Sequence, residues 1–242
     1  MSKSHPEGGL AKEIPLISES TRLFIVQIVA WVLEVLAKIE VTPQTLQNLE
    51  QLDQQLEESS VIAYAYHSSV FDALVLPIIL TKHLENVDRL LAPIAITHYQ
   101  GVQKIVLAII AALTNTEFLP VIREKDAPHY DAIFKRNLLR HVLKTTREYL
   151  AEPNTIYGVA PMGTRSETLQ SANIHPGFIK IAKKHKTPLV PISFTNNQQG
   201  RLQMSLGEIL PPPTSNDLNQ MVQFYMSQLA LILPAELRGD YH

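Results

Sequence analysis

The sequence contains no cysteine among its 242 residues. Disulfide bonds, thiolate metal sites and a cysteine nucleophile are therefore all excluded, and the absence fits a reducing, cytoplasmic location. The formal net charge is only −2, so the chain also lacks the broad positive field that holds nucleic-acid phosphates. We expect no nucleic-acid partner, and the length suits a single α/β domain.

Long hydrophobic runs are missing as well. The longest apolar run extends from Ile105 to Leu113, which is well short of the ~18 to 20 residues that a membrane span needs. Residues 1–9 carry no apolar block typical of a secretory signal, and we expect residues 1–16 to form a disordered lead-in.

Residues 22–39 are apolar except for Gln27, Glu34 and Lys38, whose spacing places them on one helical stripe. Two arrangements fit this pattern. The helix could lie in a membrane interface with Trp31 near the headgroups, or its wide apolar face could pack on the rest of the domain.

A second helix is predicted to follow, with Thr42 as its N-cap and Pro43 as its first residue. We therefore divide the chain into the lead-in, a two-helix segment over 17–58, which is membrane-interfacial in the first of the two arrangements, and an α/β domain over 59–242.

Strands and helices alternate throughout the predicted α/β domain. Because helices separate most of the strands, the fold class should be α/β, with a mostly parallel central sheet covered by helices on both faces. The expected strands are 61–66, 89–96, 117–122, 155–159, 189–194 and 202–210. The expected helices run from Ser68 or Ser69 to about Leu80, then over 102–113, 130–151, 177–185 and 217–233.

The segment from His67 to Asp72 begins where the first strand of the predicted sheet stops, and reacting groups in such sheets gather at carboxyl strand ends. If His67 precedes a helix and Asp72 lies in its first turn, the carboxylate can reach the imidazole. This pair suits a general base, with Asp72 fixing the tautomer of His67. The alternative is a capping aspartate and a histidine that only hydrogen-bonds a turn.

A second candidate is the loop over residues 161–166, which follows the strand 155–159. It lacks the lysine of a phosphate-binding P-loop, so we reject a nucleotide site. A glycine-bearing loop with Arg165 remains, able to hold a phosphate or carboxylate, unless it is an ordinary turn with a surface arginine. Arg123 ends the strand 117–122 and could face the same sheet edge.

Taken in order, these segments resemble the blocks of the glycerophospholipid acyltransferase family, which contains the lysophosphatidic acid acyltransferases. The four blocks are His67 to Asp72, Leu119 to Arg123, Met162 to Ser166, and Val190 to Ser193. The resemblance covers roughly residues 60 to 195.

The resemblance implies that His67 deprotonates an acceptor hydroxyl, which attacks the thioester of acyl-CoA or acyl carrier protein. It implies an acceptor of the lysophospholipid type, a cytoplasmic membrane surface as partner, and no cofactor or metal beyond the acyl thioester co-substrate. The implied catalytic residues are His67 and Asp72; the implied substrate-binding residues are Arg123, Gly163, Thr164, Arg165 and Ser166; and Ser69, Met162 and Pro191 are expected to shape the pocket.

Two residues depart from the family pattern. Met162 stands where the family has glutamate, and Tyr66 stands where it often has asparagine. Either change is compatible with an unusual acceptor, with reduced activity, or with a catalytically silent relative that binds lipid or acyl chains. A hydrolase is disfavoured because the chain has no Gly-x-Ser-x-Gly turn.

Overall fold

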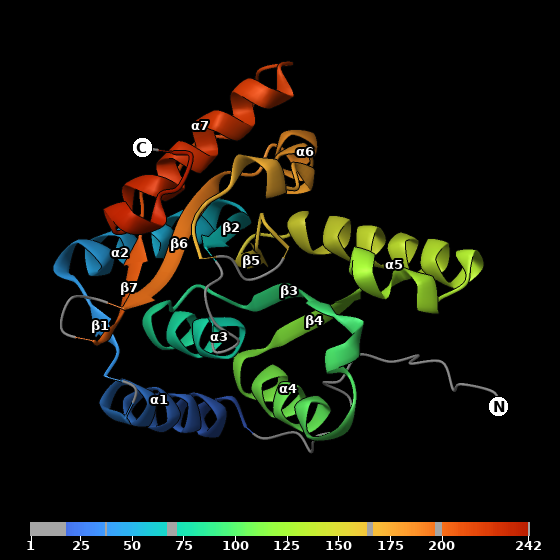
Figure 1. Ribbon diagram of the computed structural model, residues 1–242. Helices are drawn as coiled ribbons and strands as arrows, with labels where there is room; N and C mark the ends of the chain where they lie inside the picture. Colours follow the sequence, from blue (N-terminus) through green and yellow to red (C-terminus); the bar gives the residue numbers. More distant parts are fainter. Residues whose placement is uncertain (1–17, 37, 67–71, 164–166, 197–199, 242) are drawn as a thin grey trace.

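The computed structural model describes residues 18–36, 38–66, 72–163, 167–196 and 200–241. Within these ranges the chain forms a seven-stranded sheet with the order β1-β7-β6-β2-β5-β3-β4 (Figure 1). The strands are β1 (Glu40–Val41), β2 (Val61–Tyr66), β3 (Arg89–Ala95), β4 (Thr116–Val121), β5 (Thr155–Val159), β6 (Leu189–Asn196) and β7 (Leu202–Leu206).

Five neighbouring strands, β6, β2, β5, β3 and β4, run parallel, whereas β7 pairs antiparallel with β6. The predicted α/β class with a mostly parallel sheet is confirmed. The strand expected over 202–210 ends earlier, at Leu206, and only an isolated bridge joins Leu210 to Leu189. Between Leu206 and Leu210, the backbone amide of Gly207 donates to the carbonyl of Pro191 (2.9 Å).

Helices cover both faces of the sheet, as expected (Figure 1). On one face lie α1 (Glu19–Leu36), α2 (Pro43–Glu58), α3 (Asp72–His83) and α4 (Gly101–Thr114). On the other face lie α5 (Ala132–Leu150), α6 (Gly177–His185) and α7 (Leu218–Leu231).

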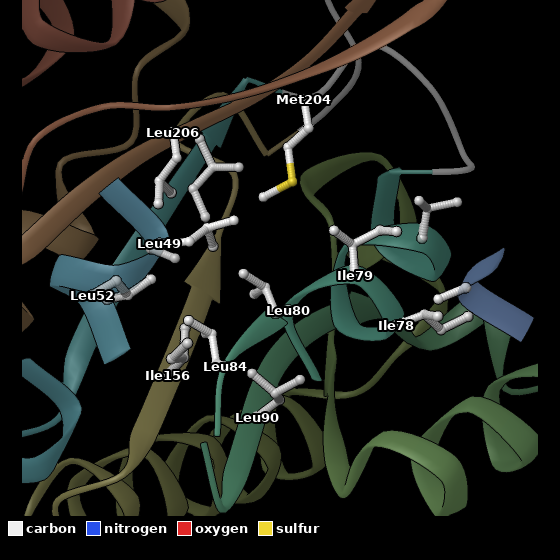
Figure 2. Close-up of a cluster of buried hydrophobic side chains, with 14 of the residues drawn as sticks. Leu49, Leu52, Ile78, Ile79, Leu80, Leu84, Leu90, Ile156, Met204 and Leu206 are labelled. Carbon is white, nitrogen blue, oxygen red and sulfur yellow. The ribbon is translucent and has the colours of Figure 1, made fainter. Parts of the chain in front are cut away.

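Alternating side chains of the central strand β2 serve both layers, because successive residues of a strand point to opposite faces. Val61 and Ala63 belong to the cluster under α1 to α4, whereas Ile62, Tyr64 and Tyr66 belong to the cluster under α5 to α7. Figure 2 shows the first cluster, where side chains of α2, α3, β3, β5 and β7 meet.

Helix α1 packs on the domain and exposes apolar residues at the same time. Val26 and Ala30 are fully buried, whereas Phe24 and Trp31 are 66% and 61% exposed. Its polar stripe meets the end of α3, where Lys82 Nζ lies 2.6 Å from the Glu34 carboxylate. Among the described residues, no helix is long and apolar enough to cross a membrane.

Helix α2 begins as predicted, with the Thr42 side chain accepting a hydrogen bond from the amide of Thr45 (3.1 Å). Both α1 and α2 contribute to the same buried cluster as α3 and α4. The division of the chain at residue 59 stays a prediction.

Candidate active site

The carboxyl ends of the five parallel strands meet at one edge of the sheet, which we call the carboxyl edge. Strand β2 ends at Tyr66, which is in register with Ser193 on β6, and Tyr64 is in register with Val159, the last residue of β5. Strand β4 ends at Val121 on the same edge. The strands β2, β4, β5 and β6, which contain or precede the four motif segments in the sequence, therefore share one edge.

Five of the expected site residues lie outside the described residues: His67, Ser69, Thr164, Arg165 and Ser166. Their roles stay predictions. Asp72 is the first residue of α3, which follows β2 along the chain. That its carboxylate lies beside His67 stays a prediction.

The loop after β5 turns sharply before it reaches Thr164. The amide of Gly163 donates to the carbonyl of Ala160 (2.9 Å), and Gly163 adopts a left-handed φ of +63°. The amide of His175 donates to the carbonyl of Pro161 (2.8 Å), and the His175 ring covers Gly163 so closely that a Cβ there would lie 3.2 Å from it. Only a glycine fits this turn without strain.

His175 was not predicted from the sequence as a site residue. It is a single exposed histidine in no recognisable motif, and its contact with Gly163 arises because the chain between β5 and α6 folds back on itself. The only sequence signal was its position two residues before Gly177.

Met162 and Tyr66, the two departures from the family pattern, are both buried in the cluster under α5 to α7. Met162 is only 3% exposed, and the Tyr66 hydroxyl donates to the carbonyl of Glu167 (2.9 Å). A glutamate in the same buried place as Met162 would need a charge partner, because an unpaired buried carboxylate is costly. The methionine therefore anchors the loop by packing.

Arg123 follows β4 and is engaged with two neighbours. Its Nε donates to Asp126 Oδ2 (2.7 Å), and its Nη2 donates to the hydroxyl of Thr97, which follows β3 (3.1 Å). The hydrogen bond from Arg123 lowers the pKa of Asp126 below its ordinary value. A phosphate at Arg123 would share the guanidinium with these groups.

An open groove of about 220 Å³ lies between the end of β4 and α5, and its lining includes Ile122, the residue before Arg123 in the chain. Apart from Lys135 its lining is apolar, with Pro120, Val121, Ile122, Ala127, Leu138, Leu139 and Val142. This groove places an apolar surface next to a cation at the carboxyl edge.

On the other side of β2, Pro191 and Ser193 lie in β6 and are buried. Pro191 packs closely on Gly207, the residue after β7, since a Cβ at Gly207 would lie 2.5 Å from the Pro191 Cγ. The Ser193 hydroxyl is buried without a hydrogen-bond partner in the described part of the chain. In the same part, no cluster of three His, Asp or Glu side chains is arranged to hold a metal ion.

Together these features define an α/β protein whose candidate site lies at the carboxyl edge of a mostly parallel sheet. The sequence profile of the family described as Acyltransferase matches residues 38–195 of this chain. The chain therefore belongs to the Acyltransferase family, and the family resemblance drawn from the motif blocks is confirmed.

Comparison with solved structures finds similarity to the 1-acyl-sn-glycerophosphate (LPA) acyltransferase PlsC from Thermotoga maritima. The match has a TM-score of 0.38 and 13% sequence identity, and it covers 86% of this chain and 95% of that chain. Comparison with curated proteins found no match.

Proposed function

We propose that this protein transfers a fatty acyl group from the thioester of acyl-CoA or acyl carrier protein to a hydroxyl of a glycerophospholipid-type acceptor. The observation that supports the proposal is that the strands carrying or preceding the four motif segments run parallel and end at one carboxyl edge, in a chain of the Acyltransferase family. His67 is the general base and Asp72 its orienting carboxylate.

The proposed reaction is a direct transfer. The acceptor oxygen attacks the thioester carbonyl carbon as His67 takes the hydroxyl proton, and the new C–O bond replaces the C–S bond. The thiolate leaves and takes the proton back from the imidazolium. The step uses the acyl thioester as its co-substrate and needs no other cofactor.

Acceptor binding is assigned to the loop after β5, with Arg165 holding the acceptor phosphate and Gly163, Thr164 and Ser166 shaping the loop. A guanidinium matches the geometry of a phosphate by donating two parallel hydrogen bonds. Arg123 supplies a second positive charge at the same edge, next to the apolar groove.

A membrane surface is the proposed place of the reaction. Its support is an apolar surface, here named the α1/α4 face, made by two helices in contact; Arg22 of α1 donates to the carbonyl of Leu113 in α4 (3.2 Å). The exposed side chains of this face are Phe24, Ile28, Trp31 and Val35 of α1, and Val102, Ile105, Val106 and Ile109 of α4. Patches of this kind mark interaction sites in soluble proteins.

Helix α4 connects this face to the candidate site. It begins at Gly101, soon after β3 ends at Ala95 on the carboxyl edge, and its first apolar residue, Val102, is 75% exposed. A lipid surface held against α4 would therefore meet the protein close to the edge where an amphiphilic acceptor has to bind.

The test is thiol release from oleoyl-CoA, with and without 1-oleoyl-glycerol-3-phosphate as the acceptor. Because the chain has no cysteine, a thiol reagent reports only the released coenzyme A. Oleoyl-acyl carrier protein, with product detected by mass spectrometry, serves as the second donor.

Acceptor-dependent release from either donor, with formation of the diacyl product, supports the proposal. Release that does not depend on an acceptor identifies a hydrolase. No release with glycerol phosphates, lysophospholipids or monoacylglycerols identifies the catalytically silent relative, and either of these two results contradicts the proposal.

A further inference from the structure

The segment after α7, residues 234–241, folds back onto the loop that leads from the candidate acceptor site to α6. The amide of Leu169 donates to the carbonyl of Leu237 (3.0 Å), and the amide of Asp240 donates to the carbonyl of Leu169 (3.0 Å). Leu169 is therefore held on both its backbone groups by residues that lie about 70 positions further along the chain.

The side chain of Asp240 adds a second pair of bonds to the same loop. Its Oδ2 accepts from both the amide and the hydroxyl of Ser171 (2.8 and 2.7 Å). These bonds satisfy the first backbone donor of the 3₁₀ turn Ser171–Asn173. Bonds to an ionised carboxylate are stronger than neutral ones, so Asp240 fixes the start of this turn.

Gly239 allows this close approach. Its φ is +53°, and a Cβ at this position would overlap the carbonyl oxygen of Leu169. Leu169 and Tyr241 are buried on either side of the contact, at 0% and 5% exposure. A side chain at residue 239 would therefore have to push Leu169 away.

Two further hydrogen bonds hold the loop, one from β2 and one within the loop itself. The Tyr66 hydroxyl of β2 holds the carbonyl of Glu167, and the His175 amide holds the carbonyl of Pro161. The first bond attaches the loop to β2, and the second closes the loop on itself. The 234–241 segment supplies the attachment on the α6 side.

We propose that Gly239 and Asp240 are positioning residues for the acceptor site: by holding Leu169 and Ser171, they determine where the loop after β5 presents its acceptor-binding residues. This inference rests on the proposed function of that loop. Neither residue belongs to a motif block, and both act through the loop backbone.

The experiment measures transfer from oleoyl-CoA to 1-oleoyl-glycerol-3-phosphate in Gly239→Ala, Asp240→Ala and Asp240→Asn. Gly200→Ala is the matched glycine control, because Gly200 has a φ of +70° but open space around its Cβ position. Asp217→Ala is the matched aspartate control, because the Asp217 carboxylate likewise accepts two hydrogen bonds, from the amides of Asn219 and Gln220 at the start of α7.

We expect Gly239→Ala and Asp240→Ala to raise the KM for the acceptor about tenfold or more, since small misplacements of a binding loop are costly. The KM for oleoyl-CoA stays unchanged, and Asp240→Asn, which keeps an accepting oxygen, stays near wild type. Hydrogen exchange at the amides of Leu169 and Ser171 accelerates in both damaging variants. Both controls lower thermal stability and leave the acceptor KM unchanged.

The positioning role is overturned if the wild type transfers acyl groups and the acceptor KM of Asp240→Ala does not change, or changes no more than that of Asp217→Ala. Asp240→Ala decides the matter alone if Gly239→Ala fails to fold. If the wild type itself shows no transfer, the proposed function fails and this inference fails with it. If the wild type transfers acyl groups but Asp240→Ala keeps its acceptor KM, only the positioning role fails. The two failures are therefore distinguishable.

Discussion

The carboxyl edge and the α1/α4 face are built in opposite ways. The edge gathers residues from segments far apart in the chain, such as Tyr66, Arg123 and Met162, and depends on strand order. The α1/α4 face is made by the exposed residues of two apolar helices that contact each other. The first region needs the whole topology, whereas each half of the second is encoded within one helix.

This difference implies that acyl transfer and attachment to a lipid surface can be impaired separately by mutation. Changes at the edge should stop the reaction and leave attachment to lipid intact. Changes on the face should weaken attachment and leave the reaction with a water-soluble acceptor intact.

The largest effect is expected for His67→Ala. Loss of the proposed general base should reduce turnover by about 10²- to 10⁴-fold, while binding to phosphatidylcholine vesicles is retained. Thiol release and vesicle sedimentation measure the two quantities. A rate near that of the wild type would remove His67 from the mechanism.

The reverse pattern is expected for the double variant Ile28→Glu/Ile105→Glu on the α1/α4 face. Replacing two isoleucines that would enter the lipid with glutamates, which remain in water, should weaken vesicle binding on the order of 100-fold. The emission of Trp31, the only tryptophan in the chain, reports binding directly as a blue shift on vesicle addition. The matched control is Ile133→Glu/Leu143→Glu, whose residues are exposed on α5 in the opposite layer. Equal weakening in the control would exclude the α1/α4 face as the docking surface.

A smaller effect is expected for Arg123→Ala. Because its guanidinium is already bound to Asp126 and Thr97, we expect about a tenfold rise in the KM of a phosphorylated acceptor. An acceptor without phosphate should show no such rise, and Lys125→Ala serves as the exposed neighbouring control. An equal rise for both acceptors would assign Arg123 a purely structural role.

The smallest effect concerns pH and the junction of α1 with α3. Burial, followed by the neighbouring charge of Lys82, lowers the pKa of His83 below 6.5, and Glu34 only partly opposes this. Since the unfolded chain then binds the proton more readily, stability falls as the pH drops below 6.5. Melting temperatures at pH 7.5 and 5.0 should differ less in His83→Gln than in the wild type. An equal difference would show that His83 is not involved.

Much of the fold could be predicted because its elements are bounded by local signals. The strands 61–66 and 155–159 and the helix 177–185 have the expected bounds. Helix α5 begins two residues later than expected because Asp131 caps it by accepting from the amide of Phe134 (2.8 Å). The two-residue strand β1 was missed, since it is too short for a periodic pattern and exists only through its pairing with β7.

The candidate site could be predicted only as far as its motifs extend. The sequence placed His67, Arg123 and Met162 near strand ends, and parallel topology brings those ends together. It could not reveal the contact of His175 with Gly163 or of Asp240 with Ser171, because such contacts depend on how loops fold in three dimensions.

The most direct measurement is a crystal structure with a non-hydrolysable thioether analogue of oleoyl-CoA. The account predicts that the carbon standing for the acyl carbonyl lies at the carboxyl ends of β2 and β5, within reach of the His67 imidazole. An analogue bound at the opposite edge of the sheet, with His67 pointing away from it, would contradict the account.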